Sequence, residues 1–581
     1  MDDGSGVTGL TRRGGGTGGA LRFRGRAGRV ARGAAALSLA AAAATVAFTV
    51  YTAYRLHVPL PYWDEWYNIL HFRLFAAGTY GLADLASQHN EHRLLLPRLF
   101  FFADAFLFHW SGLFNITVTL LLQGANAAIL IALMRRGTPG TAPRLLLGGF
   151  VLLLLFTLRQ EQNFTNGFQL QFVGVLTAAA LAALAYGAAL ERIAEGRRGA
   201  APFLALAALA AAASAYTMAN GVMTGFVLAV AALLRGAPAR VWLGTVLCSL
   251  LLAALFFHDY QPGGGSLPLA EIPSHLLAYP RFLTAYLGNP LGEDLRATQA
   301  LGLVGLALAG GAALAVASGR RRDPAGLALL TIAGFVLATA AVTAYGRVTG
   351  GSRQAFESRY ATPSLLFWCA MVVFWFPAAV RPGRITPAAL ALGALMMVLG
   401  LAACWFEATA WPALATRSAA LRQVGDSLLA GLYDAEAAGT YENTTPEEVV
   451  GFAPFLREHR LAVFAGADYD AFGRPLAATA PPGACAGTVA ARADPALGQD
   501  GVRLSGTVFE TASRRAPARL FITGAGGRVV GYGSASVPGL PSRLWTGYAE
   551  GRPGETLDVL ARRRDGSLCA VGAARSAPAG G

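Results

Sequence analysis

Residues 361–380, ATPSLLFWCAMVVFWFPAAV, form an apolar stretch without one charged side chain. An α-helix rises 1.5 Å per residue, so about 20 such residues cross a hydrocarbon core roughly 30 Å thick. Further apolar runs lie on both sides, at approximately 33–54, 113–134, 143–158, 170–190, 202–218, 220–234, 240–258, 298–318, 325–345 and 385–406. The sequence therefore predicts an all-α polytopic membrane protein with about eleven transmembrane helices.

The composition points to the same class of protein. The 581 residues are 54% hydrophobic and only 14% charged, which is typical of a chain that lies in lipid and not of a soluble enzyme. The 47 basic residues are all arginine, and the net charge is +14. Because lysine is lacking, we do not interpret this charge as a nucleic-acid surface, and we expect no nucleic-acid partner. The arginines instead indicate orientation in the bilayer.

Arginine gathers in alternate short loops between the apolar runs. These loops hold Arg135, Arg136 and Arg144; Arg192, Arg197 and Arg198; Arg235 and Arg240; Arg320, Arg321 and Arg322; and Arg381 with Arg384. The positive-inside rule assigns such loops to the cytoplasm. The arginine-rich N-terminus lies on the same side, and an odd number of crossings then places the C-terminus outside. We expect a multi-pass protein of the cytoplasmic (inner) membrane of a bacterium.

The two ends of the chain differ from the apolar part, 33–406. Residues 1–32 are rich in Gly and Arg without apolar periodicity, which predicts a disordered cytoplasmic tail; a cleaved signal peptide is the alternative. Residues 407–581 predict an extracytoplasmic soluble domain that begins with helices and ends in a β-sandwich, because runs such as GVRLSGTVFE (501–510) alternate in polarity. In an oxidising compartment we expect Cys485 and Cys569 of this domain to form a disulfide.

The first external loop, about 55–112, contains the segment YWDEW (62–66). A helix through it would place Trp63, Trp66, Tyr67, Leu70 and Leu74 on one stripe and Asp64, Asn68 and His71 on the next. We expect an interfacial helix whose aromatic face lies at the headgroups while Asp64 faces the aqueous side. Asp64 and Glu65 are the candidate catalytic residues; the alternative is a pair of solvated charges near a helix start.

Three further polar clusters lie on the same predicted side. The segment HNEHR supplies His89, Asn90, Glu91, His92 and Arg93, which we expect to bind a polar substrate; a divalent metal ion is the alternative. The segment RQEQNFTNGFQLQ offers amides suited to a hydroxyl-rich ligand, or else forms a polar hairpin; its residues are Arg159, Gln160, Glu161, Asn163, Asn166, Gln169 and Gln171. The third cluster, Arg347, Arg353, Arg359 and Tyr360, suggests phosphate binding, although Glu357 is an alternative partner for Arg353.

The predicted arrangement resembles the GT-C superfamily of polyprenyl-phosphate-sugar glycosyltransferases. The features that carry the resemblance are an N-terminal span, a long external loop with the acidic pair of YWDEW in an aromatic setting, and many spans joined by short loops. The resemblance covers most of 33–406. It implies that Asp64, or else Glu65, is the general base, that the donor is a polyprenyl-phosphate sugar, and that the acceptor is a cell-envelope glycan, lipid or protein. The segment HNEHRLLLPRL stands where several families have a Lys-Pro-Pro type segment, so the sugar and subfamily are left open.

Other classes of protein remain as alternatives. A lipid-linked glycan polymerase or ligase would act on the same kind of lipid. A transporter would need ionisable residues or broken helices within the spans, and only the pair Asn220-Gly221 suggests a break. A scaffold would work through its terminal domain. The sequence has no P-loop and no dinucleotide-binding fingerprint in a suitable context, so no nucleotide cofactor is expected.

Overall fold

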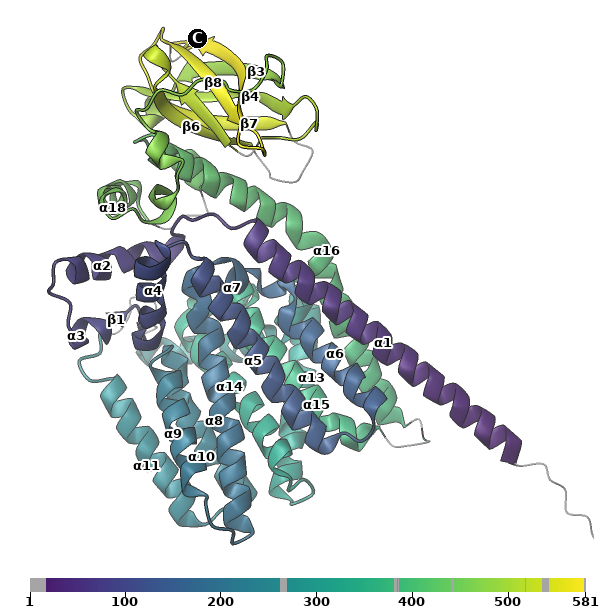
Figure 1. Cartoon of the computed structure of the whole chain (residues 1–581). Coiled ribbons are helices and arrows are strands. Elements are labelled where there is room, and N and C mark those ends of the chain that lie inside the picture. The colour runs from purple at the N-terminus through teal and green to yellow at the C-terminus, as the bar shows by residue number, and fades with distance from the viewer. Residues whose placement is uncertain are drawn as a thin grey trace, which may run out of the picture.

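The computed structural model describes residues 17–261, 269–380, 384, 386–439, 444–517, 519–535 and 543–578; it describes the side chains of these residues except at 17–28, 269, 270 and 272. A bundle of long helices forms one part of the molecule (Figure 1). A β-rich domain and the short helices α2 and α18 lie at one end of this bundle (Figure 1).

Every apolar run of the sequence is helical. Within the described residues, nine helical segments are long and apolar enough to cross a membrane: 29–55, 113–137, 141–165, 167–194, 239–256, 295–317, 324–350, 358–379 and 387–429. The two other runs form the shorter helices α9 (Ala201–Ala215) and α10 (Met223–Arg235). The 3₁₀ turn η4 (Ala219–Val222) joins α9 to α10, so Asn220 and Gly221 lie between two helices and do not break a span.

Two of the arginine-rich loops, 135–144 and 320–322, meet at one end of the bundle. A cavity of about 620 Å³ is lined there by Arg136, Glu191, Arg321 and Pro377, among others. Helix α5 (Leu113–Gly137) begins directly after the loop 55–112 and ends beside this cavity. The arginine cluster therefore lies at the opposite end of α5 from the polar loop, as the alternation of charge along the sequence predicts.

Two predicted boundaries need correction. Helix α1 (Thr17–Arg55) begins well before residue 33, so the prediction of a disordered tail is wrong for 17–32, and 1–16 lie outside the described residues. No proline interrupts 17–32, and extending an existing helix costs far less than nucleating one. Helix α16 (Pro387–Leu429) runs without interruption across the predicted domain boundary at 406/407. The last predicted span and the first helix of the predicted C-terminal domain are thus one element.

Helix α12 (Ala278–Gly288), which none of the apolar runs predicts, packs closely against α13 (Leu295–Ala317). Glycines make this contact possible. A Cβ atom at Gly302 would lie 2.0 Å from the carbonyl oxygen of Thr284, a distance at which the two backbones could not stay in place. Such close approach through small residues is typical of helix packing in membrane proteins.

The C-terminal part contains α17 (Ala435–Ala438), α18 (Pro446–Glu458) and one antiparallel sheet in the order β3-β4-β7-β6-β5-β8-β9. The strands are Cys485–Ala493, Gly501–Glu510, Arg519–Thr523, Val529–Ala535, Leu544–Glu550, Thr556–Arg562 and Leu568–Arg575, for β3 to β9 in order. The sheet curls around a core that includes Leu504, Leu520, Trp545 and Val559. The predicted β-sandwich is therefore corrected to a nearly closed barrel, because strand alternation alone does not distinguish two sheets from one curled sheet.

The seam of the barrel lies between β3 and β9. Cys485 of β3 and Cys569 of β9, the two cysteines expected to pair, are joined by a disulfide with their Cα atoms 5.8 Å apart. At the other end of the seam, the N–H of Ala493 donates to the carbonyl of Ala577 at 2.9 Å, and the N–H of Ala577 donates to the carbonyl of Ala491 at 3.1 Å. These contacts hold together the two edge strands, which would otherwise be exposed.

Candidate functional site

The polar loop 55–112 folds into short elements: η1 (Trp63–Tyr67), α2 (Asn68–Ala76), α3 (Leu82–Leu85), the strand pair β1 (Gln88–His89) and β2 (His92–Arg93), and α4 (Leu95–Phe108). The predicted helix through Trp63 is thus a 3₁₀ turn followed by an α-helix. Because a 3₁₀ turn has three residues per turn, the helical stripe does not carry over. Trp66 is fully buried and stacks on Phe452 of α18 at 6.4 Å, so the expected headgroup-facing aromatic stripe is wrong at Trp66.

Asp64 and Glu65 have different surroundings. The side chain of Asp64 is 31% exposed, and its Oδ2 lies 4.0 Å from Nε2 of His89. Glu65 is buried, and its Oε2 accepts the backbone N–H of Tyr62 at 3.3 Å. Asp64 can therefore meet a ligand from solution, whereas Glu65 holds the turn that carries Asp64.

The hairpin HNEHR brings two of its five side chains to other predicted site residues. Asn90 occupies its tip with a φ of 48°, a left-handed conformation that asparagine tolerates better than most residues. His89 lies beside Asp64, as above. Oε1 of Glu91 lies 3.8 Å from the guanidinium of Arg347. This contact brings the HNEHR hairpin together with the cluster of Arg347, Arg353, Arg359 and Tyr360.

The last two residues of HNEHR contact other parts of the bundle. Nδ1 of His92 accepts the N–H of Ala219 at 3.4 Å, and burial lowers the pKa of His92 to about 4. Arg93 donates to the carbonyl of Phe256 at 2.7 Å, at the C-terminus of α11 (Ala239–Phe256). Arg93 therefore caps a helix, which argues against its predicted contact with substrate.

Arg359 lies against the segment YWDEW. Its guanidinium carbon is 5.7 Å from the ring centre of Trp63 and 5.4 Å from that of Tyr360, distances suited to cation–π contacts. Nε of Arg359 is buried and has no hydrogen-bond partner among the residues that the structure describes. Arg359 thus holds a positive charge and an unused donor next to the residue that precedes Asp64.

Arg353 differs from the other arginines of its cluster. Its side chain is exposed in η8 (Ser352–Phe356). Within the described part of the chain, no ion pair joins it to Glu357, the alternative partner. The geometry therefore favours Arg359 and Arg347 over Arg353 as members of one site.

The amide-rich segment 159–171 lies mostly in the protein interior. Arg159 donates to the carbonyls of Asn289 at 3.0 Å and Phe356 at 2.8 Å. Asn163 donates to Oγ1 of Thr362 at 2.7 Å. The buried members are Arg159, Gln160, Asn163, Asn166, Gln169 and Gln171. Their burial argues against the predicted contact with a hydroxyl-rich ligand. Arg159, Gln160 and Asn163 instead tie separate segments together through hydrogen bonds.

Glu161, the remaining charged member of that segment, pairs with a residue that the sequence did not suggest. Its Oε2 lies 2.9 Å from the guanidinium of Arg417 in α16. Arg417 also donates to Oγ1 of Thr165 at 2.5 Å and lies 5.5 Å from the ring centre of Tyr62. The only sequence signal for Arg417 is an arginine soon after an apolar run, and the predicted domain boundary at 406/407 separates it from the spans.

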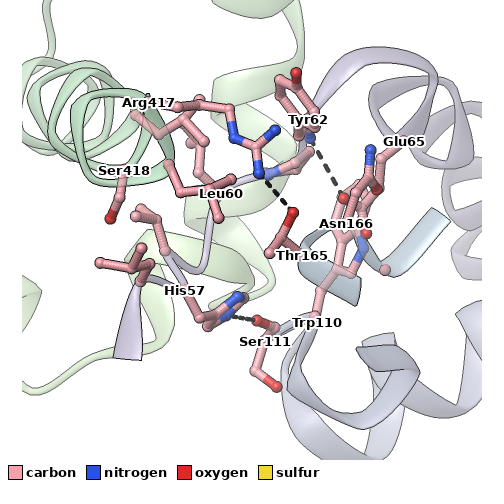
Figure 2. A pocket seen from close by; sticks show the side chains of 17 residues that line it. His57, Leu60, Tyr62, Glu65, Trp110, Ser111, Thr165, Asn166, Arg417 and Ser418 are labelled. Atoms are coloured by element: carbon pink, nitrogen blue, oxygen red, sulfur yellow. Dashed lines mark hydrogen bonds between the residues drawn. The ribbon is translucent and has the colours of Figure 1, made fainter. Parts of the chain in front are cut away.

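A small cavity lies beside the 3₁₀ turn η1 and is lined by Glu65 of this turn and by Tyr62, which precedes it (Figure 2). Its volume is about 30 Å³, which is enough for a water molecule but not for a sugar. Glu65 and Arg417 line it, and His57 reaches the carbonyl of Ser111 at 2.5 Å (Figure 2). Burial lowers the pKa of His57 to about 4, so the imidazole is neutral at pH 7. This cavity supports the loop and is not the substrate pocket.

Among the residues that the structure describes, no group of three or more His, Cys, Asp or Glu side chains is arranged to hold a metal ion. The alternative of a divalent ion at HNEHR therefore has no geometric support. The comparison with known proteins identifies no relative: no family model, no curated protein and no solved structure matches the chain.

Proposed function

We propose that the protein is a membrane glycosyltransferase that moves a sugar from a polyprenyl-phosphate donor to an extracytoplasmic glycan, lipid or protein. One observation carries this proposal. Asp64 and Arg359, the base and the phosphate-binding cation that such a reaction needs, come from distant parts of the sequence, and Arg359 contacts at 5.7 Å the ring of Trp63, the residue that precedes Asp64. The exposed carboxylate of Asp64 beside His89 adds to it.

The proposed reaction uses these two groups in sequence. The carboxylate of Asp64 takes the proton of an acceptor hydroxyl as that oxygen attacks the anomeric carbon. The bond between the anomeric carbon and the phosphate oxygen breaks, and the lipid phosphate leaves with the electron pair. Arg359 stabilises the charge on the departing phosphate through charge-assisted hydrogen bonds. A single displacement of this kind inverts the anomeric centre.

The test is transfer by the purified protein in liposomes with defined polyprenyl-phosphate sugars. Asp64→Asn should reduce the rate by about 10² to 10⁴, because it removes the base but keeps the shape. Asp259→Asn is the matched control, since its side chain is 86% exposed and its positive φ of 52° suits asparagine. Equal activity of the two variants would refute the role of Asp64. A mass analysis of envelope glycans in a deletion strain would identify the product.

The proposal also requires a membrane orientation. We infer that the arginine-lined end of the bundle is cytoplasmic and that the loop 55–112 and the barrel are external. Reporters fused after residues 138 or 322 should then read cytoplasmic, and those after 90, 355 or 500 should read external. The opposite pattern would remove the proposed site from the compartment where a flipped lipid donor is found.

A further inference from the structure

The largest of the described cavities lies between the helix bundle and the barrel, away from Asp64. Its volume is about 1000 Å³, the upper range of small-ligand sites. The end of α1, the external part of α16 and the loops at one end of the barrel line it. We call this cavity the arginine groove, after the seven arginines that line it. Arg519 pairs with Asp426; the other six, called the groove arginines below, are Arg55, Arg422, Arg514, Arg515, Arg543 and Arg564.

The charge of the arginine groove is unbalanced. Two carboxylates, Asp426 and Asp468, also line it, but both are already occupied. Asp426 pairs with Arg519, and Asp468 lies 2.5 Å from Arg562 and 3.4 Å from Arg519. Within the described residues, no ion pair joins any of the six groove arginines to a carboxylate. Six positive charges around one cavity repel one another, so the groove favours an anionic occupant.

The surroundings of three groove arginines support this. Arg422 is half-buried on α16 and faces two cations, Arg55 and Arg519, and one carboxylate, Asp426, which Arg519 already occupies. A partly buried cation with more positive than negative neighbours is costly unless a further anion compensates it. Arg543 and Arg514 lie over the ring of Phe509, at 4.4 and 5.8 Å, which leaves the edges of their guanidinium groups available for paired hydrogen bonds to an oxyanion.

The position of the groove decides which anion fits. Tyr51 of α1 stacks on Trp411 of α16 at 5.8 Å, and such aromatic pairs are typical of the membrane–water interface. Arg422 follows Trp411 on α16 by a rise of about 16 Å, or about 12 Å if the helix is tilted by 40°. The headgroup layer is only about 5 to 8 Å thick. Arg422 therefore lies beyond the lipid headgroups, whereas Tyr51 and Arg55, which also line the groove, lie at the membrane end of the groove at headgroup depth.

The barrel side of the groove is further still from the bilayer, since Arg519 of β5 meets Asp426 one helical turn after Arg422. A single phosphate would engage only a few of the arginines in a cavity of this size. We propose that the arginine groove binds a segment of an anionic glycan that carries several phosphodiester or carboxylate groups. This inference rests on the external orientation in the proposed function but not on the transfer reaction.

The experiment is a binding titration on the full-length protein in nanodiscs of neutral lipid. The probes are a fluorescent oligogalacturonate and a neutral dextran oligosaccharide of matched length. The wild-type protein should bind the charged probe and not the neutral one, and salt should weaken the binding. The triple variant Arg514→Gln, Arg515→Gln, Arg543→Gln should bind about tenfold more weakly.

The matched control is a triple glutamine variant at Arg474, Arg492 and Arg552, exposed arginines outside the groove; it should bind the charged probe as the wild type does. An equal loss of affinity in both triple variants would overturn the proposal, as would equal binding of dextran. Inorganic phosphate that binds as tightly as the oligomer would show a single-anion site instead.

Nanodiscs containing anionic lipid provide the second arm. If Arg422 and the barrel side of the groove are beyond the headgroups, the affinity for the charged probe should change little. Complete loss of probe binding in these discs would show that headgroups occupy the groove and would overturn the glycan proposal. Asp64→Asn should bind the probe normally, so a failure of transfer and a failure of glycan binding are distinguishable.

Discussion

Replacing Arg359 tests how the proposed site handles its leaving group. Arg359→Lys keeps a positive charge near the rings of Trp63 and Tyr360, but it removes the planar fork and the buried Nε donor. Arg359→Ala removes the charge as well. Lysine should therefore retain most of the loop stability and lose part of the catalysis, whereas alanine should lose both.

The expected magnitudes follow from the contacts. Two ring contacts at 5.7 and 5.4 Å contribute about 1 to 2 kcal/mol to the stability of the loop. One donor to a developing oxyanion contributes about 2.7 to 4 kcal/mol, so Arg359→Ala should lower the transfer rate by about 10² to 10³. Arg359→Lys, which keeps the charge, should lower it by about 10 to 10².

The assay is transfer kinetics with donor and acceptor varied separately, together with the Tm of each purified variant. Both substitutions should affect the donor response and leave acceptor affinity nearly unchanged, because the acceptor approaches from the aqueous side. Arg353→Ala, on an exposed side chain of the same cluster, is the control and should resemble the wild type. An unchanged donor response in both Arg359 variants would refute the reasoning.

Three further predictions concern the support of the site and the barrel. Glu65→Gln should slow transfer less than Asp64→Asn, since the amide oxygen can still accept the N–H that Glu65 holds; an equal or greater loss in transfer kinetics would exchange their roles. The Cys485–Cys569 disulfide closes 84 residues of chain, so its removal should lower the free energy of unfolding of the barrel by about 4 to 5 kcal/mol. Protease resistance of the full chain with and without reductant measures this loss. The control Cys404→Ser, at an exposed free thiol, should have no such effect. His57 has a pKa of about 4 in the folded protein and about 6.5 in the unfolded chain. Between these values the unfolded chain binds more protons, so the Tm should fall as pH drops from about 6.5 towards 4. A Tm that is constant over this range would contradict the assigned burial.

The sequence was most informative where one physical constraint acts alone. Apolar length predicted a helix at every run, and the alternation of arginine predicted that the loops 135–144 and 320–322 lie at the same end of the bundle, because both patterns are those expected of a chain that crosses a bilayer. The pairing of Cys485 with Cys569 was expected from compartment and number alone. The shape of the barrel was not, since whether a sheet curls or splits depends on which strands meet at its edges.

The site shows the limit of local patterns. The dense amides of 159–171 suggested a sugar-binding surface, but Arg159 and Asn163 are buried and bind backbone and side chains of distant segments. Composition cannot distinguish a polar side chain that faces a ligand from one that forms hydrogen bonds to buried groups of the protein itself. In the same way, Trp66 looked like a headgroup anchor because its partner, Phe452, lies in another part of the chain. Only the folded contacts distinguish these cases.

Because α16 passes from the last predicted span to the C-terminal part as one helix, a continuous helix joins the bundle to the barrel. A continuous helix sets both the rotation of the barrel about the helix axis and its distance from the bundle. One residue inserted after Trp405, on the exposed part of α16, would turn the barrel by about 100° and raise it by 1.5 Å, whereas four residues would nearly restore its facing while raising it by about 6 Å. One wall of the arginine groove belongs to the end of α1 and the other to the C-terminal part of α16 and the barrel. The rotation that an insertion causes, and not its length, would therefore decide whether the two walls still face each other.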